Sequence, residues 1–253
     1  MWTGDYAFLL RKLVLKDFKV RYRNMSLGIF WSLLNPIVTV SILTFVFTKV
    51  MPSKVPNFPV FALCGLVPFT YFTQTWGIST GSILDNAKLV KHVVAPRELI
   101  PIASVLANSM NLIIQFGLLL TLVLLTGGTV TAHWLWLPLL AAMEVAFVCG
   151  LTLITSALYV YIRDTRYVVE SINAVLFWLV PIFYSFSIIP AQYHNVYQFN
   201  PLAALTMALR NVLLDGQAPP ATLLTKLVVV SLGTLLCGWF FFGRMKSRFY
   251  DYL

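Results

Sequence analysis

Residues 99–143 read LIPIASVLANSMNLIIQFGLLLTLVLLTGGTVTAHWLWLPLLAAM, the longest run without Asp, Glu, Lys or Arg in this chain of 253 residues. A membrane-spanning helix needs about 20 apolar residues to cross a hydrocarbon core of about 30 Å. The run is too long for one such helix, and Gly127-Gly128 interrupts it. It therefore predicts two spanning helices joined by a turn.

The rest of the chain has a similar character. Hydrophobic residues make up 59% of it and charged residues only 11%, whereas a soluble domain usually contains about a quarter charged residues. This composition excludes a water-exposed globule. We predict an all-α membrane protein with six transmembrane helices, over residues 28–50, 59–83, 101–125, 136–160, 167–187 and 223–243.

Basic residues are distributed unevenly between the two sets of loops that these helices would leave. Of the 18 Lys and Arg residues, 14 lie in segments 1–27, 84–100, 161–166 and 244–253. Cytoplasmic loops of membrane proteins carry an excess of Lys and Arg, so we expect both termini in the cytoplasm. The net charge of +9 then reflects orientation, and no nucleic-acid partner is expected.

Residues 5–23, DYAFLLRKLVLKDFKVRYR, predict an amphipathic helix before the first span. At about 100° per residue, Lys12, Lys16, Lys19 and Arg23 fall within a sector of roughly 60°, and apolar side chains spread over the other side. This pattern is typical of a helix that lies in the membrane interface with its basic side toward the phosphates. The alternative is a plain cytoplasmic flank that obeys the charge rule.

Motifs of enzyme chemistry are absent from the sequence. No glycine is followed by lysine, so the chain lacks the GxxxxGK[ST] loop that cradles nucleotide phosphates. We expect no catalytic residue, metal or cofactor in this chain, and if it drives uphill transport, the energy must come from a partner chain or an ion gradient. Glu144 is the clearest ionisable residue inside a predicted span, as an ion-coupled carrier would require. An acid at the outer headgroup level is the alternative.

The longest predicted inner loop, residues 84–100, combines basic residues with apolar ones that we expect to be exposed. Exposed apolar residues favour a docking helix, which Pro96 would end. The alternative is a short amphipathic helix on the headgroups. The candidates for docking to a partner or for a cytoplasmic gate are Lys88, Leu89, Val90, Lys91, His92, Val93, Arg97 and Glu98.

Residues 188–222 form the longest stretch on the opposite side that spanning does not require. Helix-breaking residues divide it into two segments, 190–199 and 202–214, which carry few charges and are too short to span. They predict a re-entrant helical hairpin between helices five and six, with a freely soluble outer loop as the alternative. Candidate gate residues are Pro190, Asn200, Pro201, Arg210 and Asp215, the last two as a possible ion pair.

Six segments together carry a resemblance to a known family. They are KDFKVRYRNMSLGIFWSLLNP (16–36), KLVKHVVAPRELIP (88–101), YIRDTRY (161–167), PIFYS (181–185), NPL (200–202) and the basic tail after Gly243. In this order they resemble the permease subunits of ABC-2 type polysaccharide exporters, which export O-antigen, capsule and teichoic acid chains. Each segment is a weak signal alone, and residues 92–95 depart from the family's inner loop.

The resemblance implies one ABC-2 transmembrane domain over residues 1–253 in the bacterial inner membrane. Its parts would be the interfacial helix (1–27), helices one to five (28–187), the periplasmic hairpin (188–222), and the last helix with its tail (223–253). It also implies a homodimer, two separate ATPase subunits that bind ATP and Mg²⁺ and engage the inner loop, and a polysaccharide cargo on an undecaprenyl pyrophosphate carrier. Spans one and five would meet across the dimer to form the pore, which the outer hairpin would close.

Two sets of side chains suit such a cargo. Aromatic rings can contact the C–H faces of sugars, so the aromatic candidates for the glycan path are Phe30, Trp31, Tyr71, Phe72, Trp76, Phe177, Trp178, Phe183 and Tyr184. Asn35 joins them because its amide would be costly facing lipid. For each aromatic ring singly, a lipid-facing or interfacial position is the alternative. A carrier pyrophosphate requires basic groups at the inner headgroup level, and the candidates are Lys12, Lys16, Lys19, Arg23, Lys88, Lys91 and Arg97.

Three functions are compatible with these features. The first is polysaccharide export as an ATP-driven permease subunit, and the second is export of a drug or other lipid by a permease of the same ABC-2 type. The third is a membrane-embedded enzyme or ion-coupled carrier. An enzyme would need acids or histidines clustered at one membrane level, and the nine acidic residues are scattered.

Overall fold

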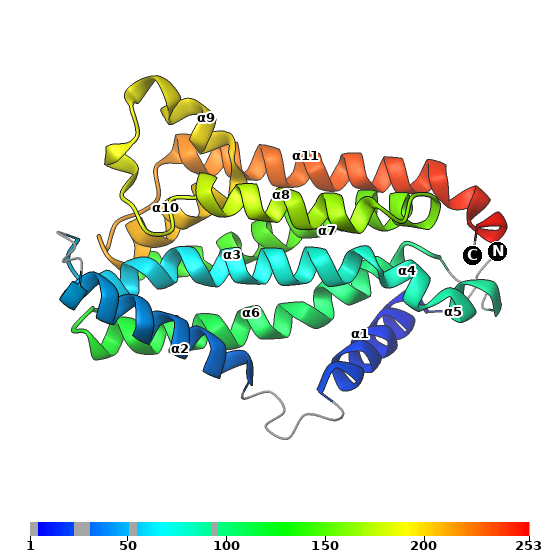
Figure 1. Cartoon of the computed structure of the whole chain (residues 1–253), viewed down its shortest axis with the longest axis horizontal. Helices are drawn as coiled ribbons and strands as arrows, with labels where there is room; N and C mark the ends of the chain where they lie inside the picture. The colour runs from blue at the N-terminus through cyan, green and yellow to red at the C-terminus, as the bar shows by residue number, and fades with distance from the viewer. Residues whose placement is uncertain (1–4, 23–30, 51–54, 93–95, 253) are drawn as a thin grey trace.

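The computed structural model describes residues 5–22, 31–50, 55–92 and 96–252, and every regular element in these ranges is helical (Figure 1). The all-α class is therefore confirmed for this part of the chain. The elements are α1 (Tyr6–Tyr22), α2 (Trp31–Phe45), η2 (Val46–Val50), α3 (Phe58–Thr80), α4 (Ser82–Asp85), α5 (Ala87–His92), α6 (Leu99–Leu125), η3 (Ala132–Trp136), α7 (Leu137–Tyr161), α8 (Thr165–Leu179), η4 (Phe186–Ile188), η5 (Ala191–Tyr193), α9 (His194–Phe199), α10 (Pro201–Leu213), α11 (Ala221–Met245) and η6 (Lys246–Asp251).

Five long helices form the body of the molecule. Figure 1 shows α3, α6, α7, α8 and α11 running along its long axis, with α4 and α5 at one end and α9 and α10 toward the other. The described chain begins and ends at the same end of this bundle, beside α5. The molecule therefore has two distinct ends, one formed by α4, α5 and the chain termini and the other by α9 and α10.

Three helical segments are long and apolar enough to cross a membrane: Leu99–Leu125, Ala132–Tyr161 and Ala221–Met245. They confirm the predicted spans at 101–125, 136–160 and 223–243. Helices also occupy the other three predicted ranges, where α2 with η2, α3 and α8 lie. Whether these three cross the membrane stays a prediction, and so does the count of six.

The predicted fifth helix, 167–187, is too long at its C-terminal end. α8 ends at Leu179, and Val180 is extended with φ −87° and ψ 132°. The next residue is Pro181, whose ring clashes with a helical conformation at the residue before it. The chain then runs without regular helix as far as η4, so the proline terminates this helix rather than kinking it.

Two hydrophobic clusters hold the helices together. The larger one joins α3, α6, α7 and α10 through side chains such as Phe72, Leu119, Leu140 and Leu205. The smaller one lies at the end of the bundle that carries α5. It brings together Leu13 of α1, Ile83 of α4, Val90 of α5, Ala157 of α7 and Phe249 of η6. The inner loop and the tail are thus packed on the bundle.

α7 and α11 touch backbone to backbone. A Cβ atom on Gly238 would lie 2.3 Å from the carbonyl oxygen of Gly150, and one on Gly150 would lie 2.5 Å from the backbone of Thr234. Only glycine fits at either position without displacing a helix. Small residues allow this close approach between helices in membranes, where van der Waals packing drives association.

Candidate functional site

The most strongly built polar site lies around Arg210 on α10. The side chain is 7% exposed, and its guanidinium donates hydrogen bonds to three backbone carbonyls. Nη2 donates to the oxygens of Ile182 at 2.8 Å and Phe61 at 3.2 Å, with longer contacts of 3.4 Å from Nε to Phe61 and from Nη1 to Tyr184. The guanidinium also lies 3.4 Å from the centre of the Phe61 ring.

The reason for this site is the break after α8. Beyond Pro181 the carbonyls of Ile182 and Tyr184 lie outside any regular helix. A buried carbonyl without a donor is costly, and the planar, multi-donor guanidinium of arginine can serve several at once. Arg210 therefore ties α10 to the broken end of α8 and to α3.

The residues at the start of α10 fix where this helix begins. The Asn200 side chain accepts a hydrogen bond from the backbone N–H of Leu202 at 3.1 Å and caps the helix, and Pro201 occupies its first turn. Residues 202–210 are all buried, so a freely soluble outer loop is excluded here. Asn200 and Pro201 thus shape the candidate gate by starting α10, whereas Pro190 is exposed just before η5.

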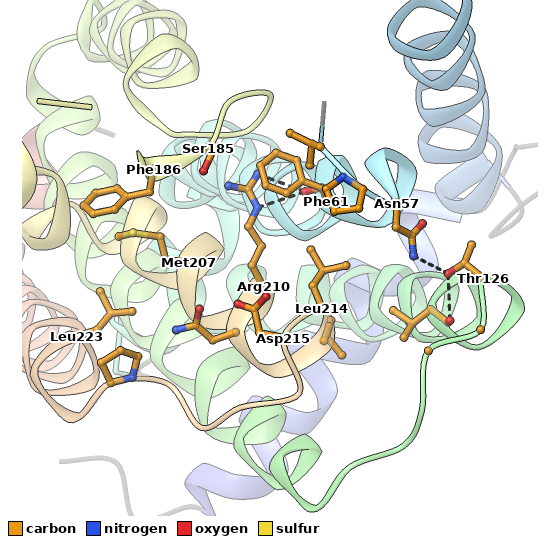
Figure 2. Close-up of a pocket in the computed structure, with 18 of the residues that line it drawn as sticks. Asn57, Phe61, Thr126, Ser185, Phe186, Met207, Arg210, Leu214, Asp215 and Leu223 are labelled. Carbon is orange, nitrogen blue, oxygen red and sulfur yellow. Dashed lines mark hydrogen bonds between the residues drawn. The ribbon is translucent and has the colours of Figure 1, made fainter. Parts of the chain in front are cut away.

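Beside Arg210 lies a cavity of about 690 Å³ (Figure 2). Its lining combines apolar residues with the polar side chains of Asn57, Ser185, Gln198, Arg210, Asn211, Asp215 and Thr222. Asn57 has a left-handed backbone with φ 49° at the start of α3, and its amide donates to Thr126 at the end of α6 over 2.9 Å. The cavity therefore lies where α3, α6, α10 and the chain after α8 converge.

One predicted contact in this region is wrong. No ion pair joins Arg210 to Asp215 in the described residues, because the guanidinium turns toward the carbonyls instead. Asp215 is exposed and meets Arg210 only through the backbone, where its N–H donates to the Arg210 carbonyl at 3.2 Å. Sequence proximity suggested the pair, but the unsatisfied carbonyls of a distant break compete better for the guanidinium.

Three of the predicted glycan-path aromatics belong to the core of the chain itself. Tyr71 is 2% exposed, Phe72 0% and Trp76 4%. The Tyr71 hydroxyl is 2.9 Å from the Ser109 hydroxyl, and the Trp76 Nε1 donates to Thr155 at 3.2 Å. These residues hold α3 to α6 and α7, so their assignment to a cargo path is corrected.

The predicted aromatics on and after α8 behave differently from one another. Phe177 and Phe183 are partly buried against the main core, with ring centres 5.7 Å apart. Trp178 is 75% exposed, and the Tyr184 hydroxyl donates to its carbonyl at 3.1 Å. Trp178 and its apolar neighbours, including Val175, form a face of α8 that no described residue covers. Phe30, and the side chains of Trp31 and Asn35, lie outside the described residues.

At the other end of the bundle, the inner loop contradicts part of its predicted role. Val90 is 2% exposed and belongs to the smaller cluster, and Leu89 packs against that cluster. They anchor α5 to the molecule and are not free for docking. Lys88 and Lys91 on the same helix are exposed. Val93 and the His92 side chain lie outside the described residues.

The C-terminal tail holds the end of this loop, which the sequence did not indicate. Lys246 Nζ contacts the Glu98 carboxylate at 3.0 and 3.2 Å, and the Arg97 guanidinium donates to the Lys246 carbonyl. The Tyr161 hydroxyl also donates to the Met245 carbonyl at 2.8 Å. Arg97 and Glu98 are therefore engaged with the tail.

The basic candidates on α1 are exposed and partly engaged. Lys12 lies 5.3 Å from the centre of the Phe8 ring, and Lys16 Nζ is 3.0 Å from the Asp17 carboxylate and contacts Asn86. Lys19 is exposed, and Arg23 lies outside the described residues. The helix packs on α6 through its Leu13 side, so only part of its apolar side is free to face lipid.

Glu144 contradicts one of its two sequence interpretations. It is 2% exposed inside α7, and neither carboxylate oxygen has a hydrogen-bond partner in the described residues. An acid at the headgroup level would be accessible, so that interpretation is wrong. The arrangement gives Glu144 no chemical role that we can derive.

This chain is a multi-helix membrane protein whose buried polar groups mainly hold helices together. It belongs to the ABC-2 type transporter family, whose sequence profile matches residues 9–214.

Individual relatives agree over nearly the full length. The chain is 30% identical over 250 residues to the O-antigen export system permease protein RfbA of Klebsiella pneumoniae, covering 98% of this chain and 96% of that protein. It is 29% identical over 247 residues to the RfbA of Myxococcus xanthus, covering 97% and 95%. It is 27% identical over 230 residues to the polysialic acid transport protein KpsM of Escherichia coli, covering 89% of each.

Proposed function

We propose that this chain is the permease subunit of an ATP-driven exporter that moves a polysaccharide out of the cytoplasm. The observation that carries the proposal is its similarity over almost its whole length to permeases of O-antigen export. A polysialic acid transporter at 27% identity widens the cargo to polysaccharides generally. Because the sequence has no phosphate-binding loop, the energy must come from a separate ATPase subunit.

The assembly that we propose is a homodimer with two ATPase subunits in the bacterial inner membrane. Each copy would span the membrane six times, with both termini in the cytoplasm as the distribution of basic residues indicates. The α5 end would then be cytoplasmic and the Arg210 end periplasmic. The cargo would be a polysaccharide on an undecaprenyl pyrophosphate carrier, as the resemblance implies.

The exposed face of α8 supports a dimer in which the second copy packs against this helix. Trp178 and Val175 are 75% and 59% exposed on a helix that otherwise packs on α3 and α7. The exposed basic side chains of α5, Lys88 and Lys91, support contact with the ATPase at the cytoplasmic end. α10 and its Arg210 site would close the periplasmic end as a re-entrant element.

The test separates the permease from its energy source. The purified chain in nanodiscs should not hydrolyse ATP, and hydrolysis should appear only after addition of its ATPase partner subunit. In cells lacking their own permease, the two genes together should restore surface polysaccharide. Hydrolysis by the purified chain alone would contradict the proposal, as would restored drug resistance without surface polysaccharide.

A further inference from the structure

A second cavity of about 510 Å³ lies at the α5 end of the bundle. α1, α4 and α6 form its walls, with a contribution from the last turn of α3. Its polar lining comes from Lys16, Asp17, Ser82, Asp85, Asn86, Ser104 and Asn108. None of these side chains has a role in the cavity beside Arg210, which lies toward the opposite end.

Two deeply buried acceptors of this lining have no partner. Ser82 is 4% exposed and Asn108 is 5% exposed, and neither Ser82 Oγ nor Asn108 Oδ1 has a hydrogen-bond partner among the described residues. The Asn108 amide nitrogen is already used, because it donates to the Ser104 carbonyl at 2.8 Å. Buried polar atoms are nearly always satisfied, so the Asn108 oxygen requires a donor from a molecule in the cavity.

The charges of the cavity favour a cation. Lys16 is neutralised by Asp17, 3.0 Å away, which leaves the Asp85 carboxylate without an ion pair in the described part of the chain. Burial raises the pKa of Asp85 and Asp17 adds to the rise, while Arg166 and Lys16 oppose it. The carboxylate is therefore undercompensated where it stands, and a donor cation would stabilise its charged form.

A metal ion does not suit this donor set. No group of three or more His, Cys, Asp or Glu side chains that could hold a metal is found in the described ranges, and Asp17 is engaged with Lys16. A primary ammonium suits it better, because it carries three N–H donors. The acceptors available to it are Asp85, the Asn108 oxygen and the Ser82 hydroxyl.

We propose that this cavity binds the headgroup of a zwitterionic phospholipid with a primary amine, such as phosphatidylethanolamine. Its ammonium would bind at Asp85, Asn108 and Ser82, and its phosphate would lie toward Lys16. The apolar side chains of Phe18, Val20 and Ile78, which also line the cavity, would contact the glycerol and the first acyl carbons. The proposal rests on the proposed location of the α5 end at the cytoplasmic leaflet, and it concerns a bound lipid rather than the exported cargo.

The experiment measures lipid retention by the permease–ATPase complex. The complex is placed in nanodiscs of equal parts phosphatidylethanolamine, phosphatidylcholine and phosphatidylglycerol, extracted into mild detergent, and the retained lipid is quantified by mass spectrometry. Phosphatidylcholine has the same net charge but no N–H donor, so it isolates the hydrogen bonds. We expect wild type to retain phosphatidylethanolamine over phosphatidylcholine by at least roughly tenfold, the magnitude of one charge-assisted hydrogen bond.

The decisive variants are Asp85→Asn and Ser82→Ala, with Asp164→Asn as the matched control on an exposed carboxylate outside the cavity. Asp85→Asn should abolish the preference and Ser82→Ala should reduce it, while Asp164→Asn retains it. Co-purification with the ATPase verifies that each variant is folded. Equal retention of the three lipids by wild type, a preference for phosphatidylglycerol, or an unchanged preference in Asp85→Asn would overturn the proposal. Surface polysaccharide is measured separately, so failure of the lipid site is distinguishable from failure of the export function.

Discussion

Replacing Arg210 by leucine should destabilise the protein because the carbonyls of Phe61, Ile182 and Tyr184 would lose their donor. Two of the four hydrogen bonds are short, at 2.8 and 3.2 Å, and we count only these. A buried acceptor left unsatisfied costs about 1–3 kcal/mol. The leucine also avoids burying a charge, which offsets part of that cost. We therefore expect a net loss of about 2–4 kcal/mol in the free energy of unfolding.

Unfolding of the purified permease in mixed micelles of increasing denaturing detergent would measure this loss. Arg210→Lys should lie between leucine and wild type, because an ammonium is a point donor and cannot serve carbonyls on two separate segments as a planar fork does. Asp215→Asn is the matched control, and it should leave stability unchanged because Asp215 is exposed and unpaired with Arg210. The reasoning is refuted if Arg210→Leu loses less than about 1 kcal/mol, the size of an ordinary surface change, or if Asp215→Asn loses as much.

Three further predictions follow from burial and packing. Val90→Asp should reduce the yield of folded permease because Val90 is 2% exposed in the smaller cluster. Lys91→Glu should leave the yield normal and weaken co-purification with the ATPase. The opposite pattern would restore Val90 as a docking residue. Trp76→Ala should lower the free energy of unfolding by about 3 kcal/mol or more through loss of a core side chain. Trp178→Ala should leave the monomer's stability unchanged and impair dimerisation or surface polysaccharide display. Equal effects of the two variants on stability would contradict this prediction. Gly238→Leu should prevent accumulation of folded protein, because its Cβ would lie 2.3 Å from the Gly150 carbonyl oxygen; normal detergent-extracted yield and size-exclusion behaviour would show that α7 and α11 can separate there.

The sequence predicted the features that depend on composition and on residues that start or end a helix locally. Charge-free runs located three spanning helices, and Asn200-Pro201 marked the start of α10, because capping and proline geometry act within a few residues. It failed where one side chain serves a distant partner. Arg210 was paired with the nearest acid, although it binds carbonyls 149 and 28 residues away in the chain. The same holds for Trp76, whose hydroxyl acceptor is 79 residues away.

A second kind of failure concerns apolar residues in loops. Val90 reads as exposed in a basic loop, but it is 2% exposed and belongs to one hydrophobic cluster with Leu13 of α1 and Phe249 of η6. Hydrophobicity shows that such a residue will be buried somewhere, and only the fold shows whether the cover is a partner or the chain itself. The exposed face of α8 is the converse case, since the aromatic pair Phe177 and Trp178 did not reveal which of the two would be partly buried and which exposed.

The attachment of the inner loop to the tail has a mechanical consequence. A force on α5 would reach the rest of the chain at two points, because Val90 packs in the smaller cluster and Glu98 contacts Lys246. The force passes into η6 and so into α11, which is locked to α7 at Gly150 and Gly238. In the proposed assembly, force from an ATPase subunit would thus reach the two helices that touch backbone to backbone at Gly150 and Gly238.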